Sequence, residues 1–135
     1  MRFHRFLDRP FRYLFYLQAA LYIAIYVSSL LSPASVSGVG LPINDKVLHF
    51  AAHLTLAVSL YLAFRSFGAR FPVKWSLAIT LVMAISTELG QHLVPGREPS
   101  LWDFAANLAG LILGYLIILT IRNYARKHLG ASRGT

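Results

Sequence analysis

The chain lacks cysteine and has few acidic residues. With no cysteine among 135 residues, no disulfide can staple its loops and no thiolate can act as a nucleophile. Only five residues are acidic, against 13 lysines and arginines, and charged residues make up 13% of the chain. There is also no internal repeat, no glycine-rich phosphate loop, no dinucleotide fingerprint and no motif that marks an activated hydroxyl. These absences argue against a disulfide scaffold, a thiol enzyme and a nucleotide-binding fold.

Hydrophobic residues are abundant instead, at 56% of the chain, with a mean hydropathy of +0.56. Four uninterrupted apolar segments can be drawn, at 13–31, 46–64, 75–94 and 101–121. Each is close to the ~20 residues that a helix needs to cross ~30 Å of hydrocarbon. The first segment is longer than the apolar part of a signal peptide, so we expect it to be retained. The sequence predicts one all-α domain over residues 1–135, a polytopic bundle of four transmembrane helices.

Basic residues flank these segments unevenly, and short cytoplasmic loops are the ones that concentrate lysine and arginine. The N-terminal tail, the loop after the second segment and the C-terminal tail should therefore face the cytoplasm, as should both termini. Only Lys46 and Arg97 fall on the opposite side. The net charge of +8 is explained by membrane insertion and anionic lipids, so we expect lipids and no nucleic acid as partners.

Polar residues gather at the extracytoplasmic ends of three of the segments, at spacings that share one helix face. They are Lys46, His49 and His53 in the second segment, Glu88, Gln91 and His92 in the third, and Asp103 and Asn107 in the fourth. All lie within about two turns of the same side. Because lipid cannot solvate such groups, the three faces should turn toward a common polar pocket.

Several of these residues also have simple structural explanations. Asn44 and Asp45 stand where a helix N-cap is expected, and Ser100 with Asp103 matches a capping box. Lys46 and Arg97 could pair with these acids and hold the helices together. Gly110 and Gly114, spaced as in a close helix contact, predict a packing surface rather than a ligand site.

Glu88 and Arg97 are the strongest candidates for a functional pair. Glu88 lies nearly two turns inside its segment, where no cap is needed, and Arg97 sits in a Pro-Gly turn nearby. The guanidinium fork suits phosphate or carboxylate groups. A metal is an alternative, because His49 with His53 and Glu88 with His92 are each four residues apart. His53 could equally bond a backbone carbonyl, no metalloprotease signature is present, and we expect neither a metal nor a cofactor.

The order of these motifs resembles the VanZ-like family of bacterial membrane proteins. The resemblance rests on Asp45-Lys46-x-x-His49-Phe50, on Glu88-x-x-Gln91 followed by Pro95-Gly96-Arg97, and on Asp103-x-x-x-Asn107-x-x-Gly110. It implies a small helix bundle in the bacterial cytoplasmic membrane, in a family named for an accessory protein that raises tolerance to teicoplanin. His53 and His92 are outside the family pattern. The site residues that carry over are Asp45, Lys46, His49, Glu88, Gln91, Arg97, Asp103 and Asn107.

Three functions follow as hypotheses. The first is a protein that binds or modifies an anionic, lipid-linked envelope component, or the glycopeptide itself, at the outer face of the membrane. The second is an accessory protein whose polar residues only hold the bundle together. The third is a lipid-phosphate hydrolase or transferase, with His49, Glu88 and Asp103 as the catalytic candidates. Whether the chain is an enzyme, and whether it forms a homo-oligomer, stays open at this stage.

Overall fold

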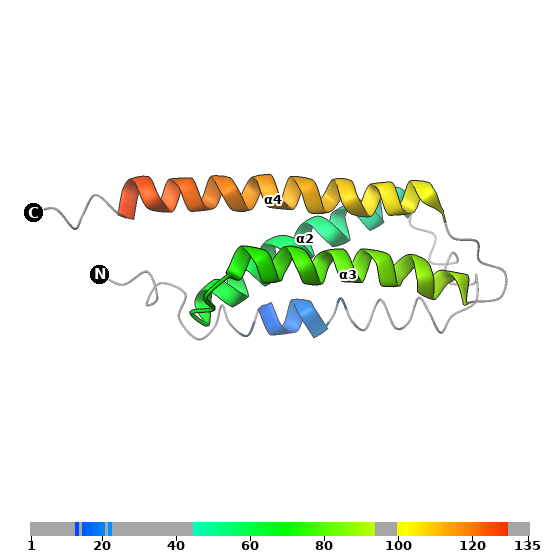
Figure 1. The fold of residues 1–135 in the computed structure, drawn as a ribbon, viewed down its shortest axis with the longest axis horizontal. Helices are drawn as coiled ribbons and strands as arrows, with labels where there is room; N and C mark the ends of the chain where they lie inside the picture. Colours follow the sequence, from blue (N-terminus) through cyan, green and yellow to red (C-terminus); the bar gives the residue numbers. More distant parts are fainter. Residues whose placement is uncertain (1–12, 14, 21, 23–44, 94–99, 130–135) are drawn as a thin grey trace, which may run out of the picture.

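Three long helices form most of the described structure (Figure 1). The computed structural model describes residues 13, 15–20, 22, 45–93 and 100–129. The long helices are α2 (Asp45–Ser66), α3 (Pro72–His92) and α4 (Leu101–Leu129), and residues 15–20 of the first apolar segment are also helical. These described ranges contain no β-strand, so the prediction of an all-α protein is confirmed for them.

Each long helix is apolar and long enough to cross a membrane. The qualifying stretches are Lys46–Ser66, Pro72–His92 and Leu101–Lys127. They correspond to the second, third and fourth predicted spans. Most of the first predicted span, 13–31, lies outside the described residues, and so do the turn that holds Arg97 and the first twelve residues.

A tight turn reverses the chain between α2 and α3. Gly68 has a φ of +73°, a left-handed conformation in which a Cβ is unfavourable. The Ala69 N–H donates to the Phe64 carbonyl at 2.9 Å and the Gly68 N–H to the Arg65 carbonyl at 3.1 Å, the two bonds of a Schellman motif. Pro72 then occupies the first turn of α3, where its missing N–H is not needed. Helix α3 therefore begins three residues earlier than hydropathy predicted.

Helix α4 differs most from its prediction, because it continues to Leu129 rather than ending at residue 121. The apolar run stops at Arg122 and Asn123, but alanine, arginine and lysine in the following turns are good helix formers. Hydropathy thus located the end of the apolar part of α4 and missed the charged C-terminal turns that continue the same helix. Figure 1 shows this end of α4 reaching past the α2–α3 turn.

Two glycines let α4 approach α2 closely. A Cβ on Gly110 would overlap the Phe50 carbonyl oxygen and lie 3.0 Å from the Leu54 nitrogen. A Cβ on Gly114 would lie 2.9 Å from the Ala57 Cβ. The predicted glycine packing surface is confirmed: the backbone of α2 lies against Gly110, and the Ala57 methyl lies nearest to Gly114.

The helices run antiparallel in sequence order, which gives the bundle two unlike ends (Figure 1). Helices α2 and α4 begin at one end of the bundle, and α3 finishes there. We call this the polar end. The opposite end, which we call the basic end, carries Arg65, Arg70, Lys74, Arg122, Arg126 and Lys127. Because α2 and α4 start at the polar end while α3 finishes there, the three polar stripes of the sequence meet at that end.

Candidate functional site

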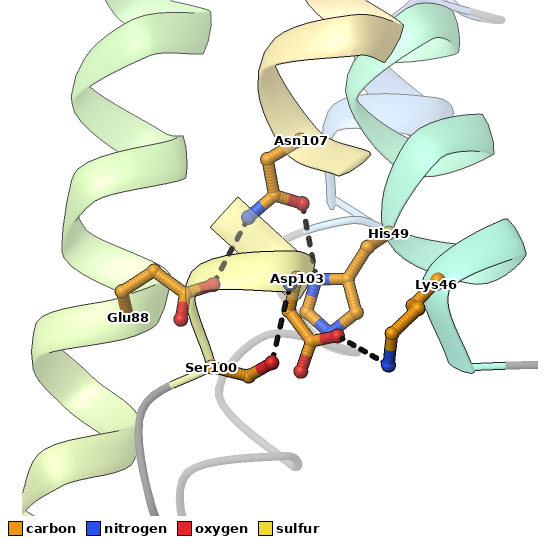
Figure 2. Close-up of polar contacts among 6 residues, drawn as sticks. All are labelled: Lys46, His49, Glu88, Ser100, Asp103 and Asn107. Carbon is orange, nitrogen blue, oxygen red and sulfur yellow. Dashed lines mark hydrogen bonds and ion pairs between the residues drawn. The ribbon is translucent and has the colours of Figure 1, made fainter. Parts of the chain in front are cut away.

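Asn107 is the centre of the polar end and connects three helices. Its side chain is fully buried, at 0% exposed. Its Nδ2 donates to Glu88 Oε1 of α3 at 3.2 Å, and its Oδ1 lies 3.0 Å from His49 Nδ1 of α2 (Figure 2). Since a carboxylate only accepts, the amide nitrogen must face Glu88, so the amide oxygen faces His49 and His49 Nδ1 carries the proton. One amide therefore fixes both the register of α3 against α4 and the tautomer of His49.

An ion pair lies one turn outside this bridge. Lys46 precedes His49 by three residues and Asp103 precedes Asn107 by four, so both face the same way one turn nearer the helix ends. Lys46 Nζ is 3.3 Å from Asp103 Oδ1 (Figure 2). The lysine side chain is 49% exposed and the aspartate side chain 11%. The pair thus joins an accessible cation to a buried carboxylate.

Asp103 also takes part in capping α4. Its backbone N–H donates to Ser100 Oγ at 3.3 Å and to the Ser100 carbonyl at 3.0 Å. Ser100 is the N-cap residue that the sequence predicted. The Ser100 half of the predicted capping box is therefore present, while the Asp103 carboxylate pairs with Lys46.

Two buried carboxylate oxygens have no hydrogen bond within the described residues. They are Glu88 Oε2 and Asp103 Oδ1. Asp103 Oδ1 has Lys46 beside it, but the contact lacks hydrogen-bond geometry. A buried polar atom left without a partner costs about 1–3 kcal/mol, more when it is charged. The polar end therefore keeps two acceptors that a donor group would satisfy.

His53 forms a second polar pair one turn deeper than His49. It is 1% exposed, and its Nδ1 lies 3.0 Å from the His49 carbonyl oxygen. A carbonyl can only accept, so Nδ1 is protonated and Nε2 of the neutral ring accepts from the Tyr22 hydroxyl at 3.3 Å. The Tyr22 and His53 rings also meet edge to face, with centroids 6.1 Å apart. His53 is thus a buried histidine with a partner on each ring nitrogen. The sequence allowed two interpretations, a metal ligand or a histidine bonded to a backbone carbonyl, and the structure shows the second.

Tyr22 is the residue of this region that sequence reasoning did not find. It lies within an apolar run, where one tyrosine gives no sign of the direction it faces. Its hydroxyl needs a partner when buried, and a histidine on the next span is the only signal that the sequence offered.

The remaining predicted site residues are placed as follows. Gln91 is buried, at 8% exposed, one turn beyond Glu88 toward the polar end, whereas His92 is exposed. Asp45 is the first residue of α2, and its side chain is outside the described part, as is all of Arg97. The structure therefore brings together Lys46, His49, Glu88, Asp103 and Asn107, and the expected pairing of Glu88 with Arg97 falls outside the described residues.

The metal alternative finds no ligand set in the described ranges. No group of three or more histidine, cysteine, aspartate or glutamate side chains is arranged to hold an ion there. His53 uses both ring nitrogens in hydrogen bonds, and His49 uses Nδ1 on Asn107. The donors and acceptors of this cluster chiefly bind one another.

The fold and the site define a class of protein: an α-helical membrane protein with a polar cluster at one end of its helices. The chain belongs to the VanZ/LLP1 family, whose family model matches residues 9–122. The match extends over the first apolar segment as well as the three long helices, and it confirms the resemblance found in the sequence. No curated protein and no solved structure matches the chain.

Proposed function

We propose that the chain spans the bacterial cytoplasmic membrane four times, with both termini in the cytoplasm. Three helices of spanning length and the helical residues 15–20 supply the elements. The six basic residues of the basic end support its cytoplasmic location, since lysine and arginine are retained on that side during insertion. In this orientation the polar end lies at the outer face of the membrane.

The polar end is, in this proposal, a binding site for the phosphate or carboxylate head group of an envelope lipid, a lipid-linked precursor or a glycopeptide. One observation carries it: Lys46 is a half-exposed cation at the polar end, and its 3.3 Å contact with Asp103 Oδ1 lacks hydrogen-bond geometry. Charged groups at membrane depth are costly and are kept where they serve binding or transport. Lys46 would contact the anionic group, and Asp103 and His49 would position the Lys46 side chain for that contact.

Binding to lipid nanodiscs tests this proposal. The full chain would be placed in nanodiscs of stated composition, and lipids that stay bound after gentle release would be counted by native mass spectrometry. Lys46→Ala should lower retention of phosphate-bearing lipids several-fold. Lys74→Ala is the matched control, because Lys74 is an exposed lysine at the basic end. Equal retention by the two variants would refute a head-group site at the polar end.

A link to glycopeptide tolerance is the part of the proposal that rests on the family name. Arg97, which follows α3 by five residues in the sequence, would complete the site with a second cation. Expression of the chain should then raise teicoplanin tolerance, and Arg97→Ala should remove that effect without lowering the amount of inserted protein. Unchanged tolerance at normal protein level would exclude this role for Arg97.

A second candidate function is purely structural, and the Asn107 bridge is the observation that favours it. If the polar residues only hold the helices together for a partner protein, Glu88→Gln and Asp103→Asn should lower the melting temperature in detergent. Variants that melt like the parent and yet lose lipid retention would exclude this candidate. Catalysis by His49, Glu88 or Asp103 stays a hypothesis of the sequence alone.

A further inference from the structure

Hydrogen-bond acceptors outnumber cations at the described part of the polar end. Lys46 is its one cation, while Glu88 and Asp103 each bring a carboxylate. The two oxygens without a hydrogen bond, Glu88 Oε2 and Asp103 Oδ1, are both acceptors. A head group that offers only phosphate oxygens would leave both of them unsatisfied and would be repelled by them.

We infer that the head group bound at this end carries a protonated primary amine beside its phosphate. This inference rests on the proposed head-group site and names the chemical class of its ligand. An ammonium brings three N–H donors, and a bond from a cation to a carboxylate is roughly twice as strong as a neutral one. The phosphate of the same head group satisfies the lysine.

The Lys46–Asp103 ion pair provides the route by which such a ligand enters. Lys46 is half exposed and lacks hydrogen-bond geometry to Asp103, so a ligand can reach the lysine, whereas the buried Asp103 carboxylate needs a cation beside it throughout. The lysine can therefore leave Asp103 for the phosphate while the ligand ammonium takes its place on Oδ1. In this exchange Asp103 keeps a cation beside it and Lys46 keeps an anion.

Glu88 gives the amine a second partner. Its Oε1 is held by Asn107, which fixes the orientation of the carboxylate and leaves Oε2 as the acceptor without a bond. Asn107 and its His49 partner thus act as positioning residues for the carboxylate that meets the ligand. Neither of them needs to touch the amine itself.

The test compares three lipids with identical acyl chains in nanodiscs of the full chain. Phosphatidylethanolamine has a phosphate and a primary ammonium, phosphatidylcholine has the same charges without N–H donors, and phosphatidylglycerol has a phosphate without a cation. Native mass spectrometry should show the ethanolamine lipid retained about tenfold more than the choline lipid, the effect of ~1.4 kcal/mol of added binding. This comparison uses the parent protein and does not depend on a variant that folds poorly.

Variants then locate the preference. Glu88→Gln and Asp103→Asn should each reduce it, Asp103→Glu should retain part of it, and Lys74→Ala at the basic end should leave it unchanged. Equal retention of the ethanolamine and choline lipids would overturn the inference, and so would a preference for phosphatidylglycerol that Asp103→Asn leaves intact. Either result, with retention still sensitive to Lys46→Ala, would leave the head-group site itself standing.

Discussion

Asn107 joins two ionisable side chains from different helices through one buried amide, and both bonds are partly buried. Replacing it by alanine removes a donor to Glu88 and an acceptor for His49 at the same time. Polar groups left without partners in a protein interior cost about 1–3 kcal/mol, although bonds between membrane helices average nearer ~0.6 kcal/mol. We expect Asn107→Ala to lower the free energy of unfolding by about 1–3 kcal/mol, measured by denaturation in mixed micelles.

Asn123 supplies the control for that variant, since it is an exposed asparagine on the same helix, bonded only locally to Arg126 among the described residues. Asn123→Ala should leave the free energy of unfolding almost unchanged. An equal loss in both variants would show that the Asn107 bridge has no special weight in holding the helices.

Tyr22 and His53 form the other residue-scale contact with a clear energetic consequence. In Tyr22→Phe the ring contact is kept and the hydroxyl that donates to His53 Nε2 is lost. We expect this variant to lose about 1 kcal/mol of stability, the usual net value of one hydrogen bond. Tyr115→Phe, on the outer side of α4, is the matched change and should be neutral by thermal melting in detergent. A neutral Tyr22→Phe would mean that His53 is satisfied without the hydroxyl.

The close contact between α2 and α4 depends on two glycines, Gly110 and Gly114, which have no side chain to keep the helices apart. An alanine methyl at position 110 would overlap the Phe50 backbone carbonyl, which cannot move without moving the whole helix. At position 114 the methyl meets a methyl, Ala57 Cβ at 2.9 Å. Overpacking of this kind costs about 1–3 kcal/mol, and we expect Gly110→Ala at or above the top of that range and Gly114→Ala nearer its lower end.

Thermal melting of the two glycine variants, together with Ala105→Val, checks this order. Ala105 is exposed on the outer side of α4, so a larger side chain there should meet no other helix. If Gly110→Ala melts at the parent temperature, the close approach of α2 and α4 is wrong.

At the scale of helices, hydropathy predicted much of what the structure shows, and its errors have simple causes. The second and third spans and the start of the fourth were located to within a few residues, because an apolar run long enough to span a membrane rarely forms anything other than a helix. The last eight residues of α4 were missed, since hydropathy does not detect a helix that continues into water. Helical phase also placed Lys46, His49, Glu88, Asp103 and Asn107 on inward faces. Pairing of Lys46 with an acid of this end was one alternative from the sequence, and the 3.3 Å contact with Asp103 confirms it. Helical phase could not say that Asn107 would bond Glu88 and His49, because such pairing depends on the relative height of the helices.

At the scale of the whole molecule, the polar cluster lies at one end and the basic residues at the other. Which end faces the outside of the cell can be measured. Because the chain has no cysteine, a single introduced thiol is the only one present. Leu101 is 85% exposed at the polar end, and Lys127 is exposed at the basic end. In intact cells a membrane-impermeant maleimide should label Leu101→Cys, and Lys127→Cys only after permeabilisation. The reverse pattern would place the polar end in the cytoplasm.

The central claim is that a lipid head group sits against Lys46 at the polar end. Solid-state NMR in bilayers of phosphatidylethanolamine measures this directly, as dephasing of lysine side-chain ¹⁵N signals by lipid ³¹P. The Lys46 signal, assigned by its loss in Lys46→Ala, should show a strong phosphorus contact that weakens in bilayers of phosphatidylcholine. A phosphorus contact confined to Lys74 and Lys127, with the Lys46 signal unaffected in both bilayers, would contradict the claim.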